Sequence, residues 1–192
     1  LREQHYFNEE AQAVAQVGSW AVLGIDEDRQ AFWSKETYRI LGIPESEPAR
    51  PSTFFARIHP EDQATVREAA RRVWEGGTPY EAEHRIVRPN GEVRWVYARA
   101  TTREVGESTE RRLVGILQDV TERHVVTAER RAAEEKYRRI VEGTSEGVWL
   151  IDAGGITSFV NARMAEMLGY SREEMLGRSL DAFMDAESVA SI

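Results

Sequence analysis

The sequence contains no cysteine and no long apolar run, and these two absences remove several classes of protein. Without cysteine there is no disulfide framework, thiolate zinc site, iron–sulfur cluster or thiol nucleophile. No stretch approaches the roughly 18 apolar residues of a membrane-spanning helix, so we expect no membrane span in this segment. Positive charge is also scarce, because 25 Lys and Arg stand against 33 Asp and Glu, for a formal net charge of -8. This balance argues against nucleic acid or an anionic membrane surface as the main partner.

What remains is the composition of an ordinary globular protein. The 192 residues are 41% hydrophobic and 30% charged, which is enough for one or two domains with apolar cores. No secretion signal is visible, so we expect a cytoplasmic protein. Residue 1 is Leu rather than Met, and we therefore expect a segment of a longer protein.

The order of the predicted elements indicates an α+β fold. Apolar spacing, caps and breakers predict helices and two short strands in the first part of the chain, over residues 1–16 (helix), 20–25 and 31–33 (strands), 35–42, 53–58 and 61–74 (helices). Three longer strands follow, over 80–88, 92–105 and 111–121. Pro89-Asn90-Gly91 predicts a type I′ hairpin turn between the first two of these. We expect one five-stranded antiparallel sheet with helices on one face.

The last long strand is apolar on both sides. Leu113, Gly115 and Leu117 point one way, and Val114 and Ile116 point the other. A sheet with one face in water would alternate between apolar and polar residues. Either the outer face is covered, by the N-terminal helix or by a second subunit, or the strand is simply central and covered by helices within one domain.

A repeat divides the chain. Residues 32–34 precede a helix that ends at 41–42, and residues 159–161 precede a helix that ends at 168–169, at a constant offset of 127 (159 − 32 and 169 − 42). A repeat of this length indicates two copies of one domain. The second copy has no counterpart of the three long strands, so we expect half a domain.

Five short motifs in the order and spacing of one family identify the first copy: GSWAVLGID, FWSKETYRILGI, RIHPED, EHRIVRPNGEVRWV and VGILQDVTER. Together they cover residues 17–123 and resemble the PAS family. EGVWLIDAGGITSFVNARMAEMLGYSREEMLGRSLDAFM resembles the first half of a second PAS domain. The resemblance implies a twisted antiparallel sheet that cups a small pocket beneath helices. The expected divisions are an N-terminal amphipathic helix (1–16), a PAS domain with C-terminal PAC-type strands (17–121), a signalling helix (122–142) and half of a second PAS domain (143–192).

The segment between the two copies is predicted to be one helix, because residues 120–142 contain neither Gly nor Pro. Val126, Ala133 and Ile140 lie seven residues apart, and Arg130 and Tyr137 fill the alternate positions of a coiled-coil seam. This seam is poor, so the pairing of two helices would be weak and able to shift. The alternative is a solvated spacer helix held by charge pairs.

Asp119 and Thr121 mark the junction between the last strand and this helix. In PAS proteins, the matching residues fasten the strand to the exit helix, and the resemblance implies a role in signal transmission. A carboxylate or hydroxyl can accept bonds from the unpaired N–H groups of a first helical turn. A plain N-cap with no regulatory role would look the same in the sequence.

The resemblance also brings several cofactors, which the residues narrow. Photoreceptor members that form a flavin adduct or attach a coumaroyl chromophore need a cysteine. Haem-binding members ligate iron through a histidine on the long helix, and residues 61–75 contain none. His59 reads as a structural part of its motif, His84 as a satisfied or exposed imidazole on a strand, and His5 and His124 as isolated. We predict no metal site, and expect no cofactor, with a non-covalent flavin or a small organic ligand left open.

A ligand pocket would be lined by aromatic side chains. The candidates are Trp20, Trp33, Tyr38, Phe54, Phe55, Trp74 and Trp95, together with Leu117. Aromatic residues also dominate small cores, so these side chains can equally be core residues without a ligand. Leu117 stands where flavin-binding relatives present a glutamine, which counts against a flavin.

No motif for catalysis is visible, and we expect this segment to be a non-enzymatic sensory input module of a larger signalling protein. The resemblance implies a histidine kinase as the output domain in cis, or otherwise an enzyme of cyclic-dinucleotide metabolism such as a diguanylate cyclase. A homodimer is expected through the N-terminal helix, the outer sheet face and the linker helix. The alternatives are a ligand-free dimerisation or scaffold module and a non-covalent flavin redox sensor.

Overall fold

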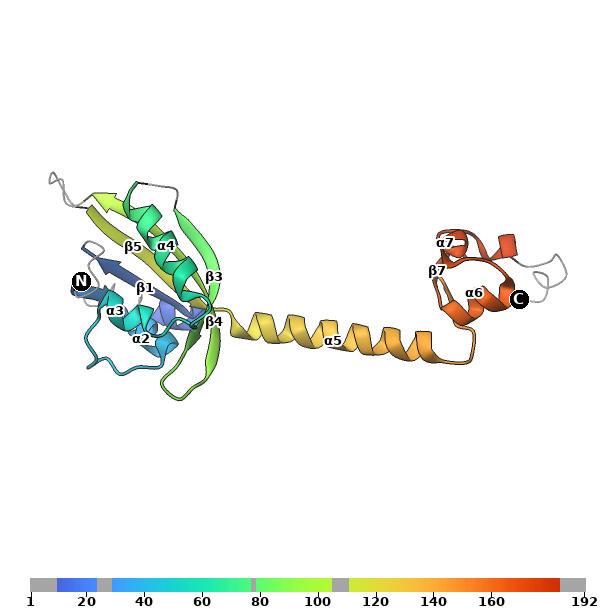
Figure 1. Ribbon diagram of the computed structural model, residues 1–192, viewed down its shortest axis with the longest axis horizontal. Coiled ribbons are helices and arrows are strands. Elements are labelled where there is room, and N and C mark those ends of the chain that lie inside the picture. The colour runs from blue at the N-terminus through green and yellow to red at the C-terminus, as the bar shows by residue number, and fades with distance from the viewer. Residues whose placement is uncertain (1–9, 24–28, 77–78, 105–110, 184–192) are drawn as a thin grey trace. The chain divides into compact units, whose positions relative to one another are not determined.

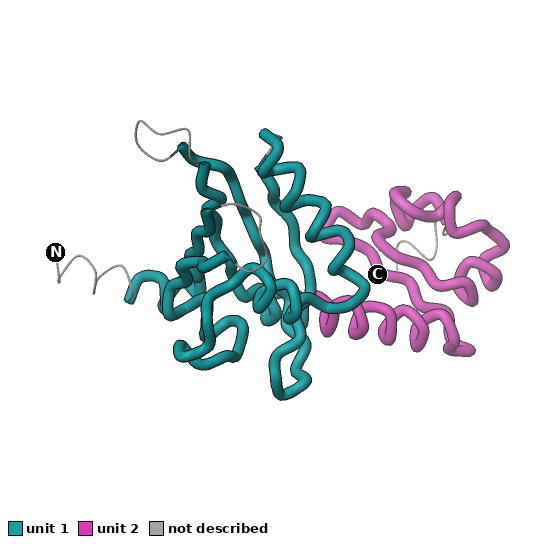
Figure 2. The backbone as a smooth tube through the Cα atoms, turned by 60° about the vertical axis from the view of Figure 1, so that its left-hand side comes forward, with its two compact units in different colours: residues 1–126 teal, residues 127–192 magenta. Residues whose placement is uncertain are grey.

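The computed structural model describes residues 10–23, 29–76, 79–104 and 111–183 (Figure 1). The chain divides into two compact units, residues 1–126 and 127–192, shown in different colours in Figure 2. The division falls within helix α5 (Thr121–Gly143). Each unit is therefore described by itself.

The first unit contains the predicted five-stranded antiparallel sheet. Its strands are β1 (Val17–Val22), β2 (Ala31–Trp33), β3 (Tyr80–Val87), β4 (Val93–Glu104) and β5 (Arg111–Asp119). They lie in the order β2-β1-β5-β4-β3, and every neighbouring pair is antiparallel. The helices α2 (Lys35–Leu41), α3 (Pro51–Phe55) and α4 (Gln63–Trp74) lie between β2 and β3 in the chain. The fold class and the sheet were correctly predicted.

The core lies on the face of the sheet that α2 and α4 cover. One buried cluster joins Ile40 and Leu41 of α2 to Ile86, Val96 and Leu117 of the sheet. A second cluster joins α4 to the other end of the same face. Alternate residues of each strand reach this face because side chains along a strand point to opposite sides. Leu113 and Leu117 are buried on this face, while Val114 and Ile116, which the alternation placed on the opposite face, are only partly buried.

Strand β1 begins earlier than predicted. The sequence places the helix over 1–16 and the strand over 20–25, with Gly18 and Ser19 as the break between them, but both residues lie within β1. A side chain at Gly18 would meet the start of α2, because a Cβ atom there would lie 2.4 Å from Thr37 Oγ1. The glycine therefore serves a close approach of strand and helix and is not a helix stop. Of the N-terminal helix predicted over 1–16, residues 10–15 are helical and residues 1–9 lie outside the described residues.

The β3–β4 hairpin also differs from its prediction. Gly91 has a φ of 83°, but Asn90 has no positive φ, so the turn is not type I′. Pro89 fixes its own φ near −65° and therefore takes the first central position of a turn that starts at Arg88. Gly91 N–H donates to the Arg88 carbonyl at 2.9 Å, and Arg88 N–H donates to Glu92 at 2.9 Å. The result is a three-residue loop that ends in a left-handed glycine.

Helix α4 is tied to β3 at its N-terminus. The Asp62 carboxylate precedes the helix and makes no cap bond to it. Instead it accepts the Arg85 backbone N–H at 2.8 Å and the Arg85 guanidinium at 2.6 Å. These bonds, the guanidinium first among them, lower the pKa of Asp62 to about 2. The carboxylate at the start of this helix therefore joins the helix to strand β3 and does not cap it.

The outer face of the sheet carries partly exposed apolar side chains. Phe32 is 59% exposed, and Val114 and Ile116 share this face. Gln12 and Ala15 of the N-terminal segment reach the strands β1 and β5 through hydrogen bonds to Ser19 and Gln118 of 3.2 and 3.4 Å. Coverage by the rest of the N-terminal helix or by a second subunit stays a prediction.

The second unit repeats the beginning of the first. It holds β6 (Trp149–Ile151), β7 (Thr157–Val160), α6 (Ala162–Leu168), α7 (Arg172–Met175) and the short helix η1 (Leu180–Phe183). Strands β6 and β7 form a two-stranded antiparallel sheet. Its small core contains Val160, Ala165 and Met175. Residues 184–192, which close the predicted half domain, lie outside the described residues.

Candidate functional site

A cavity of about 320 Å³ lies between the inner face of the sheet and helices α3 and α4. Its walls are mainly apolar. Trp20, Trp33 and Leu117 line it from the sheet, and Phe54 and Phe55 line it from α3. Gly115 leaves room for the Trp20 ring, since a Cβ atom there would lie 2.5 Å from Trp20 Cζ2. The structure thus brings together five of the eight side chains that the sequence offered as a pocket lining.

The other three candidates do not line this cavity. Tyr38 packs edge-on against Trp33 and donates its hydroxyl to the Glu47 carbonyl at 3.2 Å. Trp74 packs against the second core cluster. Trp95 is wrongly placed by the sequence reading, because it lies on the outer face of β4, where side chains alternate away from the buried Val96.

His84 and Tyr80 bring polar atoms to the apolar wall. His84 is 3% exposed and lines the cavity from β3. Its Nδ1 lies 3.4 Å from the Tyr80 hydroxyl, and its Nε2 is buried without a hydrogen-bond partner in the described part of the chain. Burial lowers the pKa of His84 to about 4, so the imidazole is neutral at pH 7. The expectation of a satisfied or exposed imidazole was therefore wrong.

The residues of this cavity do not suit an adduct-forming flavin or a haem held from the long helix. The sequence has no cysteine, and α4 (Gln63–Trp74) contains no histidine. Leu117 offers no hydrogen bond to a flavin ring. No group of three or more metal-ligating side chains is found among the described residues. The sequence-based expectation that no cofactor is bound stays a prediction.

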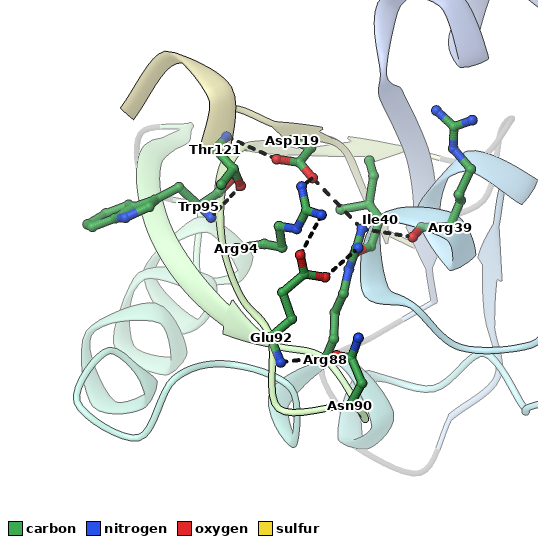
Figure 3. Close-up of polar contacts among 9 residues, drawn as sticks. All are labelled: Arg39, Ile40, Arg88, Asn90, Glu92, Arg94, Trp95, Asp119 and Thr121. Atoms are coloured by element: carbon green, nitrogen blue, oxygen red, sulfur yellow. Dashed lines mark hydrogen bonds and ion pairs between the residues drawn. The ribbon is translucent and has the colours of Figure 1, made fainter. Parts of the chain in front are cut away.

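The second feature is the junction between β5 and α5, shown in Figure 3. Asp119 Oδ1 accepts the Thr121 backbone N–H at 3.0 Å. The Thr121 hydroxyl accepts the Trp95 N–H at 2.9 Å, and Val120 N–H donates to the Trp95 carbonyl at 2.9 Å. The first residue of α5 is thereby bonded both to the strand it leaves and to the neighbouring strand β4. The two residues that the sequence assigned to transmission therefore lie together.

Two arginines, which the sequence reading missed, extend this junction to α2. Arg88 and Arg94 approach Asp119 Oδ2 at 3.8 and 3.6 Å, and Glu92 pairs with both at 3.0 and 2.6 Å. The Arg94 bond is the main reason that the pKa of Glu92 is lowered. Arg88 also donates to the carbonyl oxygens of Ile40 and Arg39 at 3.0 and 3.2 Å (Figure 3). A chain of polar contacts thus runs from the C-terminus of α2 through Arg88 to the start of α5.

The next turn of α5 is held on the outer face of the sheet. His124 stacks on Trp95, with ring centroids 4.2 Å apart and planes 8° from parallel. His124 Nε2 lies 2.6 Å from Glu83 Oε2, and Arg123 also pairs with Glu83. These bonds, that to His124 first, lower the pKa of Glu83. His124 is therefore part of the junction and not an isolated histidine.

Beyond this turn, α5 has no buried residue. The predicted seam positions Val126, Tyr137 and Ile140 are all exposed. Arg130 pairs with Glu134 at 2.9 Å along the helix surface. Both a solvated spacer and a coiled coil with a second chain agree with this, and the coiled coil stays a prediction. None of the described helices is long and apolar enough to cross a membrane.

Comparison with known proteins matches this architecture twice. Family models described as PAS fold match residues 30–117 and residues 135–190. The second match begins inside α5, ahead of the boundary at residue 143 expected from the sequence. Over 88% of its length the chain is 28% identical to the sensor protein FixL of Bradyrhizobium diazoefficiens, and over 84% it is 26% identical to the two-component sensor PprA of Pseudomonas aeruginosa.

A shorter similarity reaches a blue-light-activated histidine kinase of Brucella ovis, 37% identical over 48% of this chain and 20% of the relative. The chain spans only 33% of the first relative and 17% of the second. Among solved structures, a sensory box histidine kinase/response regulator from Burkholderia thailandensis superposes with a TM-score of 0.54 and 26% identity, over 69% of this chain and 98% of that one.

The two family matches are separated by the β5–α5 junction and fall on the repeated β-strand and helix pattern. The first contains most of the residues that line the cavity, including those on α3 and α4, while Trp20 of β1 lies ahead of it. The chain therefore belongs to the PAS family and carries two PAS-fold segments in tandem.

Proposed function

We propose that this chain is a sensory input module of a larger signalling protein, in which an event in the first PAS domain is passed through α5 to an output domain. The observation that carries the proposal is the polar junction around Asp119 and Thr121. It bonds the first turn of α5 to β4, and through Arg88 to the end of α2. Two relatives that are named as a sensor protein and a two-component sensor support the same proposal.

The contacts suggest how the signal travels. Helix α2 contributes Thr37 to the cavity wall at its N-terminal end and two carbonyl oxygens to Arg88 at its C-terminal end. A ligand that shifts α2 would change how Arg88 is held and therefore its pairing with Asp119. Asp119 also accepts the first N–H of α5. A cue that changes the pairing of Asp119 with the arginines can therefore change how firmly Asp119 holds the start of α5.

The proposed output is a histidine kinase in cis, because the Brucella relative and the Burkholderia structure are named as histidine kinases, with a diguanylate cyclase as the alternative. The segment itself is proposed to be non-catalytic, and the cytoplasmic location stays a prediction from composition. The domain divisions at 17–121, 122–142 and 143–192 are proposed as the functional units.

A second candidate is a dimerisation module that needs no ligand. The partly exposed apolar outer face around Phe32 and Ile116, and the exposed positions Val126 and Ile140 on α5, favour it. We propose that the outer face, the N-terminal helix and α5 pair two chains in either case. Sedimentation of the purified chain tests the dimer, and mass spectrometry of the native protein for a bound small molecule separates a ligand sensor from a scaffold. A non-covalent flavin sensor has no specific contact in its favour.

The transmission role is tested by removing the two junction residues in the full-length protein. Asp119→Ala and Thr121→Val should leave the first domain folded, and the output activity should lose its response to changed conditions. In the 192-residue chain, the same variants should speed amide exchange in the first turn of α5 several-fold, because that turn loses its cap. Glu134→Ala, which removes one partner of an exposed ion pair further along α5, is the matched control. Unchanged output across stimuli would reject the role.

A further inference from the structure

The cavity combines an apolar wall with one unpaired polar atom, and this combination restricts what it can bind. Among the described residues, His84 Nε2 has no hydrogen-bond partner, although the residue is only 3% exposed. A buried polar group without a partner destabilises the folded protein relative to one that is bonded. Such groups are rare in folded proteins, and each needs an explanation.

We infer that the cavity takes a small uncharged compound of one or two rings, and that His84 recognises a hydrogen-bond acceptor on it, such as a ketone or ring carbonyl. This inference rests on the proposed sensory function and adds the class of ligand. It uses His84 and Tyr80, neither of which the sequence offered as a site residue.

The Tyr80–His84 pair fixes which kind of partner is missing. A phenol is the stronger donor and a neutral imidazole nitrogen the stronger acceptor, so the Tyr80 hydroxyl donates to His84 Nδ1 across the 3.4 Å between them. The ring proton then sits on Nε2, and the unpaired atom is a donor. Burial raises the pKa of Tyr80, which keeps its hydroxyl protonated for this task. A hydrogen-bond acceptor on a ligand would then give both ring nitrogens of His84 a partner.

Size and charge narrow the ligand further. The cavity volume of about 320 Å³ lies at the low end of small-molecule pockets. Two aromatic walls, Trp20 and Trp33, favour a flat ring between or against them. The charged lining residues, Arg67 and Arg71, are exposed, and Arg71 is already paired with Glu68 and Glu75. The enclosed part therefore offers no charge to an ionic ligand.

Three probes of one shape test the inference: indane, which has no polar atom, 1-indanone, which accepts a hydrogen bond, and indole, which donates one. Each is titrated into the 192-residue chain and followed through the indole N–H signals of Trp20 and Trp33 in ¹H–¹⁵N spectra, with Trp149 of the second unit as the internal control. We expect 1-indanone to bind about tenfold tighter than indane, the equivalent of one hydrogen bond near 1.4 kcal/mol. Indole should bind no tighter than indane.

Variants assign the preference to the pair. His84→Phe keeps a ring and should bind 1-indanone and indane equally. Tyr80→Phe removes the hydroxyl that sets the ring proton and should lower the preference to about threefold or less. Tyr38→Phe, the same change outside the cavity, should leave it unchanged. If His84→Phe does not fold, Tyr80→Phe carries the test alone.

Several results would overturn the inference. They are a preference that survives His84→Phe, tighter binding of indole than of 1-indanone, or no shift of the Trp20 and Trp33 signals at the solubility limit of all three probes. An intense visible absorbance of the purified chain that His84→Phe abolishes would make His84 a metal ligand instead. Because the junction test above needs no ligand, a failure here leaves the transmission role standing and a failure there leaves the cavity standing.

Discussion

The two units begin with the same local structure and end with different burial. In the first, Ser34 accepts the N–H groups of Ser19 and Thr37 at 3.0 and 3.4 Å. In the second, Asn161 accepts those of Val148 and Met164 at 2.9 and 2.8 Å. Both caps start a seven-residue helix that ends at a left-handed glycine, with φ of 70° and 78°. The strand, cap and helix are thus one motif, built twice.

The difference lies in what covers the helix. Ile40 and Met167 occupy matching positions, 127 residues apart (167 − 40), yet Ile40 is 2% exposed and Met167 is 60% exposed. Ile40 packs against Ile86, Val96 and Leu117, which lie on the three long strands. The described part of the second unit has no such strands. The motif therefore forms from local sequence, while the core and the cavity depend on β3, β4 and β5.

The largest expected effect breaks this comparison at the matching pair. Ile40→Ala should lower the free energy of unfolding of the first unit by about 2–5 kcal/mol, because it opens a cavity among fixed neighbours. Met167→Ala should change the stability of the second unit by less than about 0.5 kcal/mol, since its side chain is already in water. Native-state amide exchange of the 192-residue chain measures each unit separately. Equal losses at the two positions would mean that Met167 is covered in solution.

A second effect belongs to the first unit alone and depends on pH. The pKa of His84 is about 4 in the folded state against an ordinary value of 6.5, so the unfolded chain binds the proton first. The contribution of neutral His84 to the free energy of unfolding is therefore fully present above pH 6.5 and falls as the pH drops toward 4. The loss approaches about 3 kcal/mol, at 1.36 kcal/mol for each pH unit between the two values.

Denaturant unfolding of the wild type and of His84→Phe between pH 7 and pH 4 measures this loss. The difference between the two proteins should shrink or reverse in favour of the variant as the pH falls. Asp62, whose pKa is about 2 against 3.8, loses most of its contribution below this window, and the small part lost near pH 4 is common to both proteins. Parallel curves for the two proteins would show that His84 titrates normally.

The parts that the sequence predicted are those written in short stretches of it. Alternation separated Leu113 and Leu117 from Val114 and Ile116 as the two faces of β5, and the spacing of caps and glycines located the repeat. The prediction of a type I′ turn was wrong because Pro89, which lies outside the Asn-Gly pair, sets the turn. Local patterns of this kind carry most of the fold.

The parts that were missed depend on neighbours far apart in the chain. Arg88 reaches α2 across 48 residues, and His124 reaches Glu83 across 41. Nothing in the sequence around His84 showed that one ring nitrogen would lie near Tyr80 and that the other would have no partner in the described part of the chain. Likewise the prediction that Trp95 lines the pocket was wrong, because strand alternation puts it on the outer face beside His124. Charged and aromatic side chains acquire their roles only when the strands pair.

The smallest expected effect sharpens the comparison of the two caps. Ser34→Ala should cost about 1 kcal/mol, the usual loss of a helix N-cap. Asn161→Ala should cost more, because Asn161 Nδ2 also donates to the carbonyl oxygens of Val141 and Glu146 at 2.8 and 3.0 Å. These two bonds join the cap of the second unit to the end of α5 and to the segment that follows it. The Ser34 side chain has a single O–H donor and cannot make two such bonds.

Asn161→Ser separates the two tasks. Serine restores the acceptor for Val148 and Met164 but not the paired donors, so it should recover about 1 kcal/mol and leave the remainder of the Asn161→Ala loss. Amide exchange at Met164 reports the cap, and exchange across Val141 to Glu146 reports the attachment to α5. If serine restored both regions, the two caps would be equivalent, and the second unit would be tied to α5 by packing rather than through this side chain. If only the cap recovers, the two donor bonds of Asn161 are what attach the second unit to the end of α5, and the Ser34 cap of the first unit has no equivalent of them.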